Sequence, residues 1–235
     1  MALSRLDKLI ALNCNVSRKD ARQLIKDGKV ILNGSPALRA QELVDTQSDE
    51  LSVDGYDFSL REHIYIMMNK PAGVISATKD DNKRTVTDII PPNLMRKSLF
   101  PVGRLDRDTT GLLIITDDGE YAHKLMSPNH EINKTYVAGL SDGLTEEAIA
   151  KIEGGIVLAD GTRCLEAKVA KLGEKTAEIT ISEGKYHQVK RMFAAAGNHV
   201  ETLRRISIGR LHLDESLAEG ECREMTDEEV ALALG

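Results

Sequence analysis

The first apolar pattern along the chain is helical. Leu6, Leu9 and Ile10 recur with the i, i+3, i+4 spacing that places side chains on one face of a helix. Ser4 precedes them and can accept a hydrogen bond from the first turn. The pattern predicts an amphipathic helix capped by Ser4.

A second helix is predicted directly afterwards. Ser17 and Asp20 have the spacing of a capping box, residues 21–25 carry an apolar stripe, and Gly28 can end the helix in a left-handed conformation. Arg18, Arg22 and Lys26 recur every four residues, so they form a basic ridge beside that stripe. The apolar run 30–32 and the Asn33-Gly34 pair then predict a strand entering a tight hairpin.

The rest of the chain mixes strand and helix patterns. Residues 56–63 are polar without a clear period and are the predicted linker, and a larger domain begins near Ile64. Helices are predicted from Thr145 to Gly154 and over 186–196. Strand-like runs occur at 64–68, 112–116, 134–138, 165–170 and 176–181. The expected fold is α+β, with a small domain at 1–59 and a larger one at 60–235 built on a mixed, mainly antiparallel sheet.

Charge is distributed unevenly within a net charge of −6. Residues 1–40 hold eight Lys/Arg against three Asp/Glu, and 183–213 hold six against two. Acidic segments follow each, with six acids and no base in 41–60, and eight acids with one arginine in 214–229. The pattern is compatible with ordinary solvated faces or with two local phosphate-binding surfaces on an acidic protein.

Several classes of protein are disfavoured. No apolar run approaches the roughly 20 residues that cross a bilayer, and the amino-terminal residues lack the continuous apolar core of a signal peptide, so a cytoplasmic protein is expected. Cys14, Cys164 and Cys222 are far apart and odd in number, which argues against a disulfide framework or a thiolate zinc site. The histidines show no metal-ligand spacing, and neither a metal nor a cofactor is expected.

The densest chemical signal is the run FPVGRLDRDTTGLLIITDDG at 100–119. A polar loop leads into an apolar strand, and an extended loop would point Arg104, Asp106 and Asp108 to one side. The residues alone leave two interpretations open: a carboxylate held beside a guanidinium, or a charged turn. Asp117-Asp118-Gly119 is predicted to be a turn after the strand, so a two-carboxylate glycosidase has no convincing second acid.

The amino-terminal runs RLDKLIA, SRKDARQLIKDGKVILNG and LSVDG resemble the alpha-L RNA-binding domain named for small-subunit ribosomal protein four. The resemblance covers about residues 3–58. It implies that the ridge, with Arg18, Lys19, Arg22 and Lys26, lies against RNA phosphates. The alternative is that these residues only solubilise a small helical module.

Four runs of the larger part resemble, in order and spacing, the motifs of the RsuA branch of the pseudouridine synthases. They are NKPAGV at 69–74, GRLDRDTTGLLIITDDG at 103–119, KTYVAGL at 134–140 and EGKYHQVKRMFAAAGNHVETLRRISIGRLHL at 183–213. The resemblance implies an RNA isomerase that converts a uridine of ribosomal RNA to pseudouridine, most specifically the 16S uridine conventionally numbered 516.

The same resemblance assigns the chemistry. Asp106 is implied as the catalytic carboxylate, which either attacks C1′ or removes a sugar proton; the two routes use the same residue. Lys190 is the expected cation beside it, and Tyr136 the ring that stacks on the uracil. The alternatives without a catalytic role are that Lys190 is a solvent-facing lysine on a helix and that Tyr136 is a core tyrosine.

The remaining expectations concern RNA. A uridine must leave its stack to reach the pocket, and Arg104 is expected to fill the space it vacates or to contact a phosphate. Lys70, Arg191, Arg204 and Arg205 are further expected RNA contacts, although Lys70-Pro71 could instead pack beneath the catalytic loop. The chain is expected to be a monomer whose partner is small-subunit ribosomal RNA or an assembly intermediate. The rival function is a non-catalytic RNA-binding assembly factor on the same scaffold.

Overall fold

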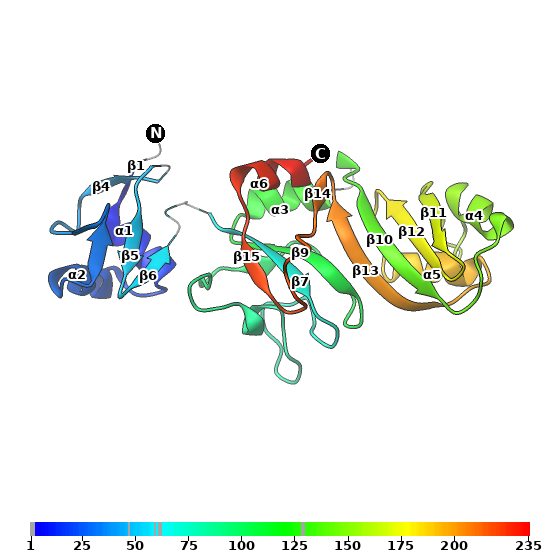
Figure 1. The fold of residues 1–235 in the computed structure, drawn as a ribbon, viewed down its shortest axis with the longest axis horizontal. Coiled ribbons are helices and arrows are strands. Elements are labelled where there is room, and N and C mark those ends of the chain that lie inside the picture. Colours follow the sequence, from blue (N-terminus) through cyan, green and yellow to red (C-terminus); the bar gives the residue numbers. More distant parts are fainter. Residues whose placement is uncertain (1–2, 47, 59, 61–62, 128–129) are drawn as a thin grey trace.

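The computed structural model describes residues 3–46, 48–58, 60, 63–127 and 130–235. Two helices and six short strands form the amino-terminal part, coloured blue to cyan in Figure 1. They are β1 (Leu3–Arg5), α1 (Leu6–Asn13), α2 (Arg18–Lys26), β2 (Val30–Leu32), β3 (Ser35–Pro36), β4 (Leu43–Asp45), β5 (Leu51–Val53) and β6 (Tyr56–Phe58). Strands β3-β2-β5-β6 form one sheet and β1 pairs with β4. Their apolar side chains enclose a core with α1 and α2.

The predicted first helix is confirmed but its cap is wrong. Ser4 lies in β1 opposite Val44, and the helix follows Arg5, which makes no side-chain cap bond. The second helix is confirmed at both ends: the Ser17 side chain accepts from the Asp20 N–H, and Gly28 has a φ of +69°. The predicted hairpin between β2 and β3 is also confirmed, since both residues of its turn have positive φ values.

The predicted linker at 56–63 is wrong in its first half. Residues 56–58 form β6, paired with β5, and Leu60 is 3% exposed in the amino-terminal core. The polar pattern misled because β6 is a short edge strand whose side chains are largely in water. Residue 59, at the expected domain boundary, lies outside the described residues.

One large mixed sheet organises the remainder, in the order β11-β12-β10-β13-β9-β7-β15, with β8 and β14 attached at β9 and β13. The only parallel pair in the described part of this sheet is β13 with β9, so the expected mixed, mainly antiparallel sheet is confirmed. Its strands are β7 (Tyr65–Lys70), β8 (Phe100–Pro101), β9 (Thr110–Thr116), β10 (Lys134–Leu140), β11 (Lys168–Gly173), β12 (Thr176–Ile181), β13 (Val200–Ile208), β14 (Leu211–His212) and β15 (Cys222–Glu224).

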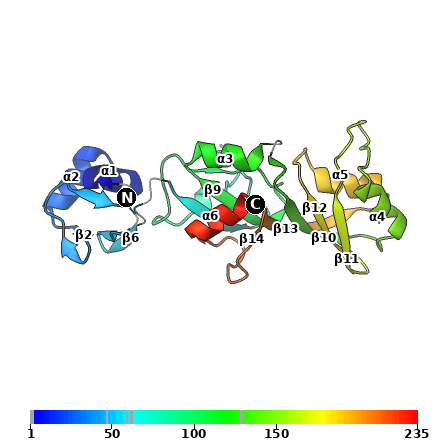
Figure 2. The ribbon, with the colours of Figure 1, turned by 90° about the horizontal axis from the view of Figure 1, so that it is seen from above.

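Helices cover both faces of this sheet (Figures 1 and 2). Alternate residues of β9 face opposite cores: Leu112 and Ile114 pack with α3 and α6, whereas Leu113 and Ile115 belong to the core that α4 and α5 cover. The helices are α3 (Gly119–Met126), α4 (Glu146–Glu153), α5 (Gln188–Ala195) and α6 (Asp227–Ala233). Among the described residues, no helix combines the length and apolarity needed to cross a bilayer.

Most predicted elements of this part are confirmed, with shifted ends. Thr145 caps α4 as expected, whereas α5 begins at Gln188, two residues after the predicted start. The turn predicted at Asp117-Asp118-Gly119 is instead a helix start, because the Asp118 side chain accepts from the N–H groups of Glu120 and Tyr121 and caps α3. A strand over 200–208 was not predicted. The charged side chains of this strand interrupt the alternation of apolar and polar residues that would predict it.

Candidate active site

Residues 103–109 form the Asp106 loop, which connects β8 to β9. Gly103 begins it with a φ of +74°, a conformation that suits glycine. Leu105 is buried, its N–H donates to the Ser76 hydroxyl, and that hydroxyl donates to its carbonyl, both at 3.0 Å. The loop is therefore anchored on the residue immediately before Asp106.

Lys70 holds the other end of the loop. Its side chain is fully buried, and Nζ donates to the carbonyls of Pro71 at 3.0 Å, Arg107 at 3.3 Å and Thr109 at 2.9 Å. Burial lowers the pKa of this ammonium to about 8. The expected RNA contact at Lys70 is wrong, because a buried lysine with three carbonyl acceptors cannot reach a phosphate. The alternative, a structural residue beneath the loop, is confirmed.

Asp106 lies between two basic side chains of the α5 region. Its Oδ2 lies 3.4 Å from Nζ of Lys190, and its Oδ1 lies 3.4 Å from Nε2 of His187. The Asp106 side chain is 25% exposed, so solvent or substrate reaches it. The expected proximity of Lys190 to Asp106 is confirmed, and the carboxylate is held by both neighbours in a partly desolvated position.

Lys190 is shared with a second acid. Its Nζ donates to Oδ1 of Asp108 at 2.6 Å, and that hydrogen bond lowers the pKa of Asp108. Asp108 is 74% exposed, in contrast to Asp106. The two acids of the loop thus differ in environment, and the more enclosed one faces the cavity described below.

The turn into α5 places His187. This residue has a φ of +48°, and its ring stacks on Tyr186 with centroids 3.8 Å apart. Gln188 is buried, accepts from the Lys185 N–H at 2.8 Å and donates to Glu183 at 2.6 Å. Gln188 therefore fixes the turn that leads into α5, while His187 contacts Asp106 itself.

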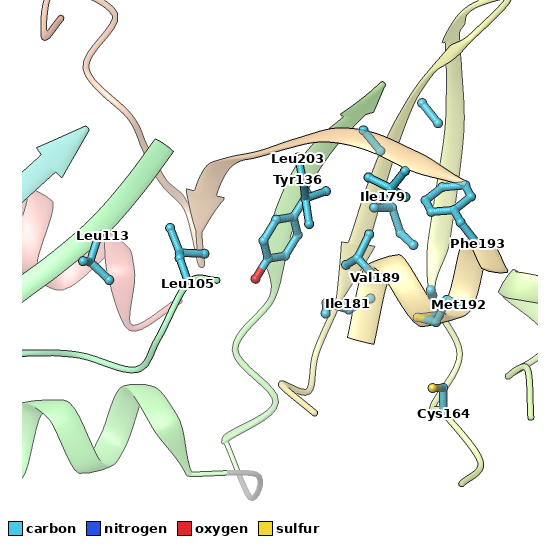
Figure 3. Packing of buried hydrophobic residues seen from close by; sticks show 14 of the residues in the cluster. Leu105, Leu113, Tyr136, Cys164, Ile179, Ile181, Val189, Met192, Phe193 and Leu203 are labelled. Atoms are coloured by element: carbon cyan, nitrogen blue, oxygen red, sulfur yellow. The ribbon is translucent and has the colours of Figure 1, made fainter. Parts of the chain in front are cut away.

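Tyr136 projects from β10 beside the Asp106 loop. It is 8% exposed and packs in the same core as Leu105 and Val189, as Figure 3 shows. The guanidinium carbon of Arg205 lies 5.9 Å from the centre of its ring. The ring makes a core contact and also lines the cavity, so the core contact is confirmed and the stacking role stays a prediction.

A cavity of about 760 Å³ opens over these residues. Arg104, Asp106 and Tyr136 line it, together with two buried cations, Lys134 and Arg205. A smaller hollow of about 70 Å³ shares Asp106 and Tyr136 with it. The larger cavity exceeds the size of a single base and lies within the usual range of ligand sites.

Two expected RNA contacts lie away from this cavity. Arg204 is on the opposite face of β13 and lines a separate hollow with Val137 and Ile206. Arg191 pairs with Asp160 at 2.5 Å. Fewer basic residues therefore converge on Asp106 than the motif predicted. Arg204 points away because alternate residues of β13 face opposite sides of the sheet.

The basic ridge of α2 is organised by a buried acid. The Asp7 side chain has no exposed area, and its oxygens lie 3.0 Å from Arg5, 2.5 Å from Arg18 and 3.1 Å from Arg22. The three arginines are each about half exposed, with side-chain values of 42 to 50%. The side chains of Arg18 and Arg22 thus remain about half exposed to solvent, while their ion pairs with Asp7 hold them in place.

Sequence reasoning missed three residues at the site. Lys134 lies in a motif that carries the resemblance and Ser76 lies two residues after one, but nothing in their spacing indicated burial. Asp7 is preceded and followed by ordinary helix-forming residues, so its burial was invisible. A buried position for Lys134 could have been inferred from β10, because it shares a strand face with Tyr136 two residues later.

Two family models match this chain. The family model described as RNA pseudouridylate synthase matches residues 64–195, and an S4 domain model matches residues 4–51. An uncharacterized RNA pseudouridine synthase of Bacillus subtilis is 45% identical over 97% of both chains. Ribosomal small subunit pseudouridine synthase A of Escherichia coli is 39% identical over 97% of this chain and 98% of that protein.

Other relatives bear a different name. Ribosomal large subunit pseudouridine synthase B of Bacillus subtilis is 42% identical over 97% of this chain and 94% of that protein. A crystal structure of a pseudouridylate synthase superposes with a TM-score of 0.68 at 38% identity, covering 97% of this chain and 99% of that one. The chain therefore belongs to the RNA pseudouridine synthase family, in its RsuA-type branch with an amino-terminal S4 domain.

Proposed function

We propose that this enzyme converts one uridine of ribosomal RNA to pseudouridine with Asp106 as its catalytic carboxylate. The observation that carries the proposal is the position of Asp106, at the edge of the cavity, 3.4 Å from both Lys190 and His187 and beside Tyr136. Asp108, the other acid of the loop, is mostly in solvent.

The reaction rearranges bonds without a redox change. The N1–C1′ bond of the uridine breaks, C1′ bonds to C5, the proton of C5 leaves and N1 gains one. Asp106 acts either as a nucleophile at C1′ or as a base toward a sugar proton, and both roles need its carboxylate at the sugar. Lys190 and His187 offset the desolvation of that carboxylate as the RNA covers it.

The pocket retains the uracil while it turns. Tyr136 offers its ring for stacking, and Leu105 contributes apolar area to the same core. A uridine enters only after leaving its own stack, which costs a few kcal/mol. Arg104, exposed at the cavity edge, fills the vacated space in the RNA.

The amino-terminal domain, residues 1–59, adds affinity through phosphates. Arg18, Lys19, Arg22 and Lys26 are all exposed along α2. Asp7 fixes the guanidinium groups of Arg18 and Arg22, which reduces the entropy lost when they bind a phosphate. The enzyme acts as a monomer in the cytoplasm.

The proposed target is 16S uridine 516. Relatives named small-subunit synthase A support it at 39 to 40% identity, whereas the Bacillus subtilis large-subunit synthase B has 42%. Because overall identity does not separate the two, the test must offer both RNAs. The rival function, a non-catalytic assembly factor, would use the same RNA-binding surfaces.

The experiment incubates the enzyme with 16S and 23S RNA, free and in ribosomal assembly intermediates. Pseudouridine is then mapped by carbodiimide-blocked primer extension. A single new stop at 16S uridine 516 is the expected result. A stop only in 23S RNA would contradict the target, and no stop in any ribosomal RNA would favour the assembly factor.

A further inference from the structure

Two buried cations line the active-site cavity, and the proposed reaction gives neither of them a role. Lys134 on β10 is 8% exposed and Arg205 on β13 is 4% exposed. Nζ of Lys134 donates to the Ile132 carbonyl at 2.8 Å, and Nε of Arg205 donates to the Leu112 carbonyl at 2.8 Å. Both line the cavity that contains Asp106.

A bulge between β10 and β13 turns Arg205 toward this cavity. Thr135 pairs with Ser207, but Tyr136 pairs with Arg205, so Ile206 is skipped. In a regular ladder Tyr136 would oppose Ile206, and Arg205 would project from the other face of the sheet. Bulges that re-aim a side chain occur next to active sites. The register thus places an arginine directly beside Tyr136.

The positive charge of the pair lacks a balancing group. Among the described residues, none brings a carboxylate within ion-pair distance of Lys134 or Arg205, and Nη2 of Arg205 is buried without a hydrogen-bond partner. Burial, and then the nearby Arg205, lower the pKa of Lys134 to about 8. Buried cations are ordinarily paired, so the site is complete only when an anion enters.

We propose that Lys134 and Arg205 form a subsite for the phosphodiester that adjoins the target uridine. The inference rests on the proposed active site at Asp106 and Tyr136. The guanidinium carbon of Arg205 lies 5.9 Å from the centre of the Tyr136 ring, so a nucleotide whose base stacks on that ring would bring its backbone within reach of Arg205. The uracil is neutral when it binds, whereas a phosphodiester carries a permanent negative charge that can balance the two cations. The cavity volume of about 760 Å³ accommodates a nucleotide rather than a base alone.

The guanidinium geometry fits this ligand. With Nε bound to a carbonyl and Nη2 unpartnered, Arg205 presents a donor that can reach one phosphate oxygen, and Lys134 can reach a second. The subsite would lock the flipped nucleotide by its backbone while leaving the base free to turn on Tyr136. Lys134 and Arg205 are then substrate-binding residues that act on affinity, not on bond cleavage.

The test uses a stem-loop RNA carrying the uridine that the wild-type enzyme modifies, with one neutral methylphosphonate placed 5′ or 3′ of it. Affinity and single-turnover rate are measured for wild type, Arg205→Gln, Arg205→Lys and Lys134→Met. Arg204→Gln, next in sequence on the opposite face of β13, is the matched control. Circular dichroism checks the fold of each variant.

Wild type and Arg204→Gln are expected to bind at least about tenfold more weakly when one of the two phosphates is neutral, since a charge-assisted contact is lost. Arg205→Gln and Lys134→Met should bind the ordinary RNA more weakly and lose less affinity on the modified one than wild type does, because one of the two contacts is already absent. Arg205→Lys should recover part of the affinity. A full methylphosphonate penalty in both Arg205→Gln and Lys134→Met would overturn the subsite. The subsite would also be overturned if Arg205→Gln and Lys134→Met bound the RNA as tightly as wild type but slowed the chemical step, because the two residues would then contact the uracil.

Two further outcomes remain decisive. If Arg205→Gln does not fold, the test rests on Lys134→Met and on the affinity of wild type for the two methylphosphonate RNAs. Wild type that binds both of these as tightly as the ordinary RNA contradicts the proposal. If wild type modifies no RNA, the proposed function fails separately. The subsite is then tested by binding of uridine 5′- and 3′-monophosphate against uridine, with equal affinities overturning it.

Discussion

Lys190 and Asp106 form an ion pair in which Nζ lies 3.4 Å from Oδ2. The same Nζ lies 2.6 Å from the solvent-facing Asp108, so the lysine is closer to the acid that faces away from the cavity. Lys190 is therefore shared between the two acids, and Asp106, the more enclosed of them, has His187 as a second basic neighbour.

Removal of this cation should slow the reaction. Lys190→Met leaves Asp106 with His187 as its basic neighbour, and we expect a loss of about 100-fold in single-turnover rate, the usual scale for one electrostatic contact in an active site. Lys190→Arg should keep most of the rate. Arg191→Met, which removes a cation paired with Asp160, is the control. Lys190→Met with the rate of wild type would refute this role.

Asp7 should make the amino-terminal domain sensitive to acid. Burial would raise its pKa, but hydrogen bonds from Arg18, Arg5 and Arg22 lower it to about 2 from 3.8. Because the folded pKa is the lower one, the stabilising contribution is present above pH 3.8 and is lost as the pH falls toward 2. Asp7→Asn should cost about 1 to 3 kcal/mol at neutral pH.

Urea unfolding of wild type and Asp7→Asn, at pH 6 and at pH 2.5, measures this effect as a difference between the two proteins. The difference should shrink at the lower pH, since protonated Asp7 resembles asparagine. A difference that stays constant across this window would show that the arginines do not hold the carboxylate in its charged form.

The α2 ridge is best tested at its lysines. A glutamate at Arg18 or Arg22 would face the buried Asp7 and disturb the fold, so those positions confound binding with stability. Lys19→Gln/Lys26→Gln should instead weaken RNA binding and reduce the slope of log affinity against log salt by about 2, one for each phosphate contact. Lys168→Gln, exposed on β11, is the control. An unchanged slope would mean that the ridge is only solvated.

Gly111 is required where β13 pairs with β9. Its φ is +98°, and an added Cβ would lie 2.2 Å from the carbonyl oxygen of Arg205. Gly111→Ala should therefore destabilise the protein by about 3 kcal/mol or more and displace Arg205. Gly197→Ala has a similar φ of +87° with open space around it, and should cost only about 1 to 2 kcal/mol. Equal melting temperatures for the two variants would contradict this account.

The sequence was informative where local chemistry decides structure. Ser17, Gly28 and Thr145 end or begin helices through contacts within a few residues, and these were predicted correctly. The proximity of Asp106 and Lys190, by contrast, was expected only from the family resemblance and not from any local pattern.

What escaped prediction depends on tertiary context. The sequence left Lys70 between an RNA contact and a structural role, and the choice depends on loop carbonyls more than thirty residues away that accept from its Nζ. The face that Arg205 occupies follows from a one-residue bulge that no period reveals. Ser4 lost its predicted cap role because it pairs with β4, a long-range contact that overrides local preference.

The central claim is that Asp106, not its neighbour in the loop, carries the chemistry. Single-turnover pseudouridine formation is measured on the RNA that wild type modifies, for Asp106→Asn and for the matched change Asp108→Asn. Asp106→Asn should form no detectable pseudouridine while still binding the RNA, and Asp108→Asn should stay within about tenfold of wild type, since its carboxylate is mostly in water. Modification by Asp106→Asn at the wild-type rate would contradict the account.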